Sequence, residues 1–150
     1  MLDAFTEFAH TYYYPLVVLM ALFGLYFFRH KKVFLAALLF SAVVAQAVKP
    51  LYDEPRPCAG APSCPESTGF PSVHAAAAGV FAIASIGSPA FVFAAPFSVL
   101  LAYSRVHADV HSAEQVFAGY ALGLMVYGLL WAFLHKHAAH DLVVRHKLLE

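Results

Sequence analysis

Residues 104–115 read Ser-Arg-Val-His-Ala-Asp-Val-His-Ser-Ala-Glu-Gln, a polar segment in a chain that is otherwise strongly apolar. No Asp, Glu, Lys or Arg occurs from residue 67 through 104, or from residue 115 through 135. Within the polar segment, Arg105 is cationic, and His107 and His111 can accept or donate protons near neutral pH. An ordinary loop between two membrane helices would explain the segment taken alone, so its function depends on what the rest of the chain adds.

The composition is typical of a membrane protein. Hydrophobic residues make up 61% of the 150 residues and charged residues 12%, whereas soluble domains carry about 25% charged residues. Basic and acidic residues balance at nine each. The net charge therefore gives no reason to expect a nucleic-acid partner. At this length we expect a single domain, residues 1–150.

Apolar runs predict an all-α, integral-membrane bundle of about five transmembrane helices. A helix needs about 20 apolar residues to cross a bilayer. The runs lie at residues 12–28, 33–48, 72–86, 91–103 and 115–134. The first run follows an acidic N-terminus without the basic start or cleavage site of a signal peptide, so we expect it to be retained.

Basic residues predict the orientation of the bundle in the cell membrane. Arg29, Lys31 and Lys32 follow the first run, and a basic tail at residues 135–150 follows the last. The predicted helices place both clusters on one side, which is cytoplasmic by the positive-inside rule. The polar segment and the loop at residues 49–70 would then face away from the cytoplasm.

Two earlier polar stretches would lie at the same membrane face as the polar segment. Residues 49–57 read Lys-Pro-Leu-Tyr-Asp-Glu-Pro-Arg-Pro, and residues 71–74 read Pro-Ser-Val-His. The three stretches together supply a lysine, two arginines, a hydroxyl and the free N–H groups of a helix start, which are groups that bind phosphate. Two histidines, His74 and His111, suffice for a proton donor and a nucleophile. No cluster of carboxylates and thiols has metal-ligand spacing, so we expect neither a metal nor a cofactor.

The three stretches in this order resemble the type 2 phosphatidic acid phosphatase superfamily. Its signature is K-x6-R-P, then P-S-G-H, then S-R-x5-H-x3-D. The positions that match are Lys49, Arg56, Pro57, Pro71, Ser72, His74, Ser104, Arg105 and His111. The resemblance covers about residues 49–123, with the same order and spacing throughout.

The resemblance implies a role for each matching side chain. His111 would attack phosphorus to form a phosphohistidine, and His74 would protonate the leaving lipid oxygen. The residues expected to hold the phosphoryl group are Lys49, Arg56, Ser72, Val73, Ser104 and Arg105. The implied activity is metal-independent hydrolysis of a lipid phosphate or diphosphate, such as phosphatidic acid or undecaprenyl diphosphate, at one membrane face.

Two positions depart from the family pattern. Val73 replaces the glycine of the second motif, and its branched side chain would crowd the phosphate. Gln115 replaces the aspartate that orients the nucleophilic histidine. Its amide oxygen can accept the Nδ1 proton but cannot compensate the charge of an imidazolium as a carboxylate does. Glu114 or Asp109 could supply the carboxylate from a shifted position.

The sequence leaves other functions open. A family member impaired by its departures would bind a lipid phosphate or a partner protein without turnover. A vanadate-dependent haloperoxidase would share the phosphate pocket, although those enzymes are soluble and the apolar runs argue against one. The lipid substrate and the oligomeric state are not decided by the sequence.

The remaining polar residues have structural interpretations. Asp53 and Glu54 are interpreted as loop charges and not as catalytic acids, and His107 as a loop histidine. Cys58 and Cys64 lie in the same loop, where an oxidising compartment would permit a disulfide. Two free thiols are the alternative.

The predicted orientation can be tested by thiol labelling with an impermeant reagent in intact cells. In a background that lacks Cys58 and Cys64, we expect labelling of Gly60→Cys and His107→Cys, because both positions would face outward. We expect His30→Cys to be protected. Labelling of position 30 with protection of position 60 would overturn the orientation.

Overall fold

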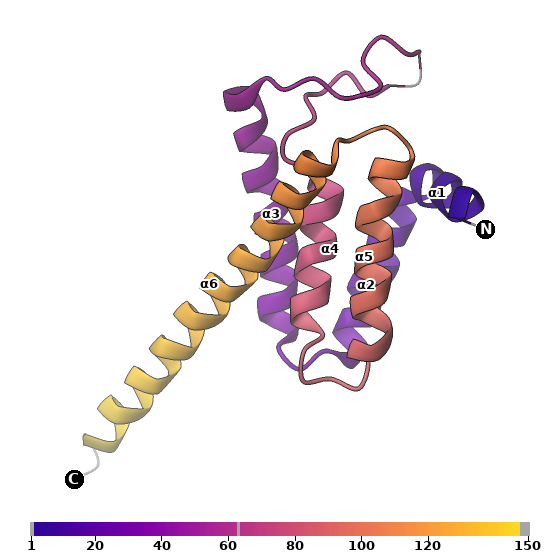
Figure 1. The fold of residues 1–150 in the computed structure, drawn as a ribbon. Coiled ribbons are helices and arrows are strands. Elements are labelled where there is room, and N and C mark those ends of the chain that lie inside the picture. The colour runs from indigo at the N-terminus through magenta and orange to yellow at the C-terminus, as the bar shows by residue number, and fades with distance from the viewer. Residues whose placement is uncertain (1, 63, 148–150) are drawn as a thin grey trace.

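The computed structural model describes residues 2–62 and 64–147 (Figure 1). Within these residues the chain forms six helices and no strand, so the prediction of an all-α fold is confirmed. The helices are α1 (Leu2–Thr11), α2 (Tyr13–Phe27), α3 (Lys31–Tyr52), α4 (Val73–Ala84), α5 (Phe91–His107) and α6 (Ala113–Lys147).

Helix α4 is the centre of the bundle, and it contacts α2, α3, α5 and α6. Figure 1 shows α2, α3, α4 and α5 running along one another, while α6 crosses them diagonally and extends beyond them. Residues 75–82 of α4 are buried, and five of these eight are alanine. Small side chains allow the neighbouring helices to approach α4 closely, as in membrane helix bundles.

Glycine residues bring α4 and α6 into backbone contact. A β-carbon at Gly123 would collide with the carbonyl oxygen of Ala76, and one at Gly119 would collide with that of Ser72. The small residues of the last apolar run therefore allow α6 to approach α4 closely. This contact also sets the start of α6 directly against the start of α4.

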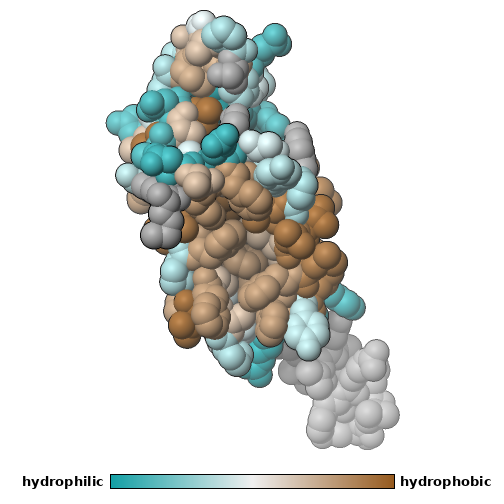
Figure 2. All heavy atoms as spheres, turned by 90° about the vertical axis from the view of Figure 1, so that its right-hand side faces the viewer, coloured by the Kyte–Doolittle hydropathy of each residue, from teal (hydrophilic) through white to brown (hydrophobic). Residues whose placement is uncertain are grey.

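Large apolar side chains face outward along the helices. Exposed examples are Val18, Leu39, Phe40, Phe93 and Met125. Figure 2 shows a band of hydrophobic surface between more hydrophilic ends. Within the described part of the chain, α3 and residues 113–136 of α6 are long and apolar enough to cross a membrane, and α2, α4 and α5 include shorter apolar helices. These are the features of a membrane protein.

Three helices extend beyond the runs predicted from the sequence. Helix α3 continues through Lys49 and Pro50 and ends where Asp53 adopts a left-handed conformation, with φ of 41°. Helix α5 continues past residue 103, where the apolar run ends, through Arg105 to His107. Polar side chains do not interrupt the backbone hydrogen bonds of a helix, so the last turn forms although its residues are polar. The basic tail, which follows the last predicted run, continues α6 as far as Lys147; residues 148–150 lie outside the described residues.

Helix α1 was not predicted from the sequence. It packs against α5, where the Phe5 and Phe97 rings lie 6.2 Å apart and the Asp3 carboxylate is 2.8 Å from Nε2 of His107. A ten-residue helix with polar and acidic residues gives no membrane-helix signal. His107, interpreted as a loop histidine, therefore lies in the last turn of α5 and contacts α1.

A pair of glycine substitutions tests the contact between α4 and α6. We expect Gly123→Ala to destabilise the protein by about 1–3 kcal/mol, because the added carbon must displace the α4 backbone. At Gly128 nothing lies within 4 Å of an added β-carbon, so Gly128→Ala should change stability by less than about 1 kcal/mol. Thermal unfolding in detergent measures both, and equal effects at the two positions would contradict the packing.

Candidate active site

The structure brings the three polar stretches together at one end of the bundle. The ends of α3 and α5 meet the beginnings of α4 and α6 there (Figure 1). The predicted site residues that are buried are Lys49, Arg56, Ser72, Ser104, Arg105, His111 and Gln115. Buried charged and polar groups of this kind are typical of a functional site.

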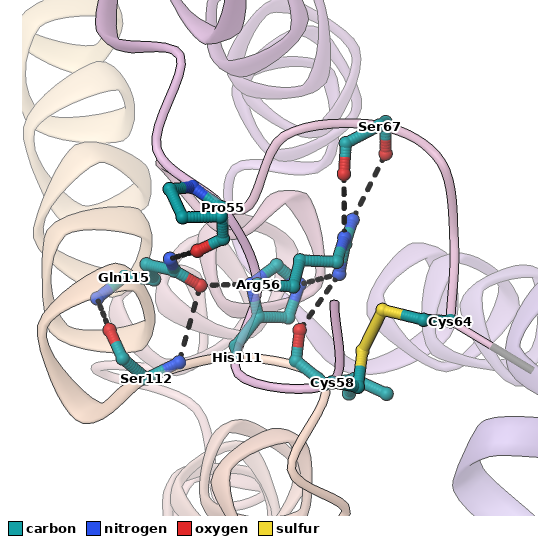
Figure 3. The surroundings of a disulfide bond; sticks show 9 residues. Pro55, Arg56, Cys58, Cys64, Ser67, His111, Ser112 and Gln115 are labelled. Carbon is teal, nitrogen blue, oxygen red and sulfur yellow. Dashed lines mark hydrogen bonds between the residues drawn. A yellow bond between two sulfur atoms is a disulfide. The ribbon is translucent and has the colours of Figure 1, made fainter. Parts of the chain in front are cut away.

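His111 lies between Arg56 and Gln115 (Figure 3). Its Nε2 is 2.9 Å from Nη1 of Arg56, and its Nδ1 is 3.1 Å from Oε1 of Gln115. A guanidinium has only donors, so Nε2 accepts this hydrogen bond with its lone pair. The ring proton is then on Nδ1, which donates it to the Gln115 oxygen. The arrangement fixes a neutral His111 tautomer with a nucleophilic nitrogen facing Arg56.

The neighbours of the Gln115 amide determine which end is oxygen and which is nitrogen. Oε1 also accepts from the backbone N–H of Ser112 at 3.2 Å. Nε2 donates to Oε1 of Glu54 and to the carbonyl oxygen of Pro55, both at 2.9 Å. Exchanging the two amide ends would set donors against donors and acceptors against acceptors, so the network itself supports the assignment.

The environment of His111 favours the neutral ring. Burial, followed by the positive charge of Arg56, lowers the pKa of His111 from 6.5 to about 3. The hydrogen bond to Gln115 acts in the opposite direction but is the smaller effect. A neutral imidazole is the form that can attack phosphorus, so the site holds His111 in its nucleophilic form.

The proton-donor candidate lies close to this ring. The ring centroid of His74, in the first turn of α4, is 6.3 Å from that of His111. His74 is partly exposed, whereas His111 is almost completely buried. The two histidines therefore lie close enough to act on opposite sides of one phosphoryl group, with His74 nearer to solvent.

Basic side chains of the first motif hold the loop between α3 and α4. Lys49 donates to the carbonyl oxygen of Thr68 at 2.7 Å. Arg56 donates from Nε to the Ser67 carbonyl oxygen at 2.7 Å and from Nη2 to the Ser67 hydroxyl at 3.0 Å. Both basic groups are thus fixed over the same end of the bundle.

A disulfide joins Cys58 and Cys64 within this loop. Figure 3 shows it beside the segment that carries Arg56. Of the two alternatives that the sequence left open, the structure contains the disulfide.

The two predicted serine ligands are placed differently. Ser72 caps the N-terminus of α4, where its hydroxyl accepts from the Ala75 N–H at 3.4 Å. The Ser104 hydroxyl is fully buried and donates to the Leu101 carbonyl oxygen at 2.7 Å, within its own helix. Val73 begins α4, so its backbone N–H is among those that a helix leaves without an internal acceptor.

The carboxylate that accepts a hydrogen bond from the Gln115 side chain is neither of the two that the sequence suggested, Asp109 and Glu114. Asp109 and Glu114 are exposed, whereas Glu54 is the acid that contacts the Gln115 amide. Gly69 was also missed: a β-carbon there would collide with the Gln115 amide, so this glycine leaves room for the side chain. No spacing rule connects residues 54 and 69 with residue 115, because the contact depends on how the loop folds back.

Comparisons with known proteins agree with the fold and with the motifs. A family model described as the PAP2 superfamily matches residues 30–139. The chain is similar to the crystal structure of the first transmembrane PAP2 type phosphatidylglycerolphosphate phosphatase from Bacillus subtilis, with a TM-score of 0.66 and 22% sequence identity. That match covers 90% of this chain and 75% of the other, and it shows a shared fold. A comparison with curated proteins finds no significant match.

The His111 tautomer can be tested by nitrogen NMR on histidine-labelled protein over a range of pH. We expect the ring to stay neutral, with its proton on Nδ1, down to about pH 4, because its pKa is lowered toward 3. Protonation of the ring near its ordinary pKa of about 6.5, or a proton on Nε2, would contradict the geometry.

Proposed function

Since the chain belongs to the PAP2 superfamily, we propose that it hydrolyses a lipid phosphate or diphosphate without a metal ion, with His111 as the nucleophile. One observation carries the proposal. The Nε2 lone pair of His111 points at Arg56, while Nδ1 is held by Gln115. A phosphoryl group that binds Arg56 would therefore arrive directly in front of the nucleophilic nitrogen.

Substrate binding changes the partner of Arg56. In the free site Nη1 donates to His111, at 2.9 Å. A phosphate oxygen is a stronger acceptor than a neutral ring nitrogen, so the guanidinium transfers this hydrogen bond to the substrate. The exchange exposes the Nε2 lone pair only when a phosphoryl group is present. Lys49, Arg105 and the α4 N-terminus, including the Val73 N–H, add positive potential at the same place.

The first chemical step forms a phosphohistidine. The Nε2 lone pair forms a bond to phosphorus, and the bond from phosphorus to the lipid oxygen breaks. The electron pair of that bond stays on the oxygen, which takes a proton from His74. Nδ1 of His111 keeps its proton and its hydrogen bond to Gln115, so the ring becomes cationic as the new bond forms.

The second step releases phosphate. His74, now neutral, takes a proton from a water molecule, and the oxygen of that water bonds to phosphorus. The bond from phosphorus to Nε2 then breaks, and its electron pair returns to His111. Arg56 and Lys49 stabilise the negative charge on the phosphoryl oxygens in both steps.

The location of the site suits a substrate held in a bilayer. The polar groups lie at one end of an apolar bundle, where a lipid headgroup would enter while its hydrocarbon chains stay in the membrane. The similar Bacillus subtilis protein is named a phosphatidylglycerolphosphate phosphatase. We propose a lipid substrate of the same chemical class, at the face of the membrane opposite the basic Arg29–Lys32 cluster, which is the non-cytoplasmic face by the positive-inside rule.

Substitution of the two histidines tests the mechanism with phosphatidic acid and an aryl phosphate as substrates. His111→Ala should abolish turnover and the capture of radioactive phosphate on the protein, because no nucleophile remains. His74→Ala should slow phosphatidic acid hydrolysis by about 10²–10⁴-fold, but should slow the aryl phosphate much less, because an aryl oxide leaves without a proton.

The matched control is His107→Ala, which removes a histidine of the same segment that contacts Asp3 and not the site. It should keep nearly full activity. An active His111→Ala protein would refute the proposed nucleophile. Equal losses on both substrates in His74→Ala would refute the assignment of His74 as the acid.

A further inference from the structure

We propose that Glu54 is a positioning residue that supplies, through the Gln115 amide, the negative charge that His111 needs when it becomes cationic. The inference rests on the proposed function, because it concerns the phosphohistidine step. It deepens that function by identifying a carboxylate at a site whose expected aspartate position is occupied by Gln115.

Two consecutive hydrogen bonds, with the Gln115 amide between them, connect Glu54 to His111. Nδ1 of His111 donates to Oε1 of Gln115 at 3.1 Å, and Nε2 of Gln115 donates to Oε1 of Glu54 at 2.9 Å. An amide accepts at one end and donates at the other, so it can relay polarisation between an imidazole and a carboxylate. A positive charge on His111 strengthens both bonds at once.

The backbone around Glu54 positions its side chain for the hydrogen bond to Gln115. The Glu54 carbonyl oxygen accepts from the Gly69 N–H at 2.8 Å, which joins the two ends of the loop. The absence of a side chain at Gly69 leaves room for the Gln115 amide. The next carbonyl, that of Pro55, accepts the second proton of the same amide nitrogen. These contacts define where the Gln115 nitrogen lies and where its donors point.

The charge of Glu54 is available to His111. Within the described part of the chain, no ion pair to the Glu54 carboxylate is present. The carboxylate is partly buried, and Gln115 and His111 are almost completely buried, so water screens the interaction less than at the surface. A charge so placed stabilises the cationic ring of the transition state more than the neutral ring of the free enzyme, and so acts on kcat.

Exchanging the carboxylate at position 54 and the amide at position 115 tests whether the charge of Glu54 acts on His111 through Gln115. Glu54→Gln keeps an oxygen that can accept from Gln115 but removes the charge, so we expect kcat for phosphatidic acid to fall about 10-fold with KM unchanged. Combining Glu54→Gln with Gln115→Glu places the carboxylate directly on Nδ1 of His111 and should restore kcat to at least the parent value.

Asp53→Asn is the control, since it removes the neighbouring exposed charge and keeps a residue that tolerates a left-handed conformation. It should retain the parent kcat.

Three results would overturn the inference: parent kcat in Glu54→Gln, no recovery in the exchanged variant, or an equal loss in Asp53→Asn. Thermal unfolding is measured on every variant, and a loss of kcat accompanied by an equal loss in the fraction folded also counts against a relay. His111→Ala, assayed in parallel, separates this inference from the proposed function. An inactive His111→Ala protein with fully active Glu54→Gln removes only the relay, whereas an active His111→Ala protein removes both.

Discussion

Gln115 forms hydrogen bonds with all three polar stretches, and the geometry of the site depends on them. Its amide oxygen accepts from His111, and its amide nitrogen reaches the loop of the first motif at Glu54 and Pro55. Its backbone carbonyl oxygen accepts from the N–H of Ser72 at 3.0 Å, which attaches the second motif. The side chain is almost completely buried, so these bonds do not compete with water. One residue at the start of α6 therefore sets the positions of His111, of the loop that carries Arg56 and of the α4 N-terminus.

The packing of α4 against α6 makes these bonds possible. Gly119 and Gly123 let the backbones of the two helices touch, so Gln115, in the first turn of α6, lies within reach of Ser72. The rest of the bundle presents apolar side chains outward and keeps its buried polar groups mostly at one end. A lipid bilayer that covers the apolar band would leave this end at the membrane surface, where the basic side chains can meet a phosphate. Both the packing of the bundle and the geometry of the site therefore depend on the close approach of α4 and α6.

The sequence was sufficient to predict the all-α fold, the family and the gathering of the three motifs, because each rests on local patterns. Long apolar runs specify helices in a bilayer, and the motif spacing identifies the superfamily, which the family model confirms. Predicted boundaries were less accurate where polar residues continue a helix, as in the last turns of α3 and α5. The sequence did not indicate that Glu54 contacts Gln115, because 61 positions separate them and only the folded loop brings them together. Helix α1 was missed because its contacts with α5 are tertiary.

A structure of the protein with orthovanadate bound would test most directly whether His111 is the nucleophile of a phosphoryl-transfer site. Vanadate takes up the five-coordinate geometry of phosphoryl transfer, so it reports which groups meet the reacting phosphorus. We expect vanadium bonded to Nε2 of His111, an apical oxygen facing His74, and the Arg56 guanidinium on vanadate oxygens instead of on Nε2. Vanadate bound away from His111, with the contact between Arg56 and His111 unchanged, would contradict the proposal that His111 is the nucleophile.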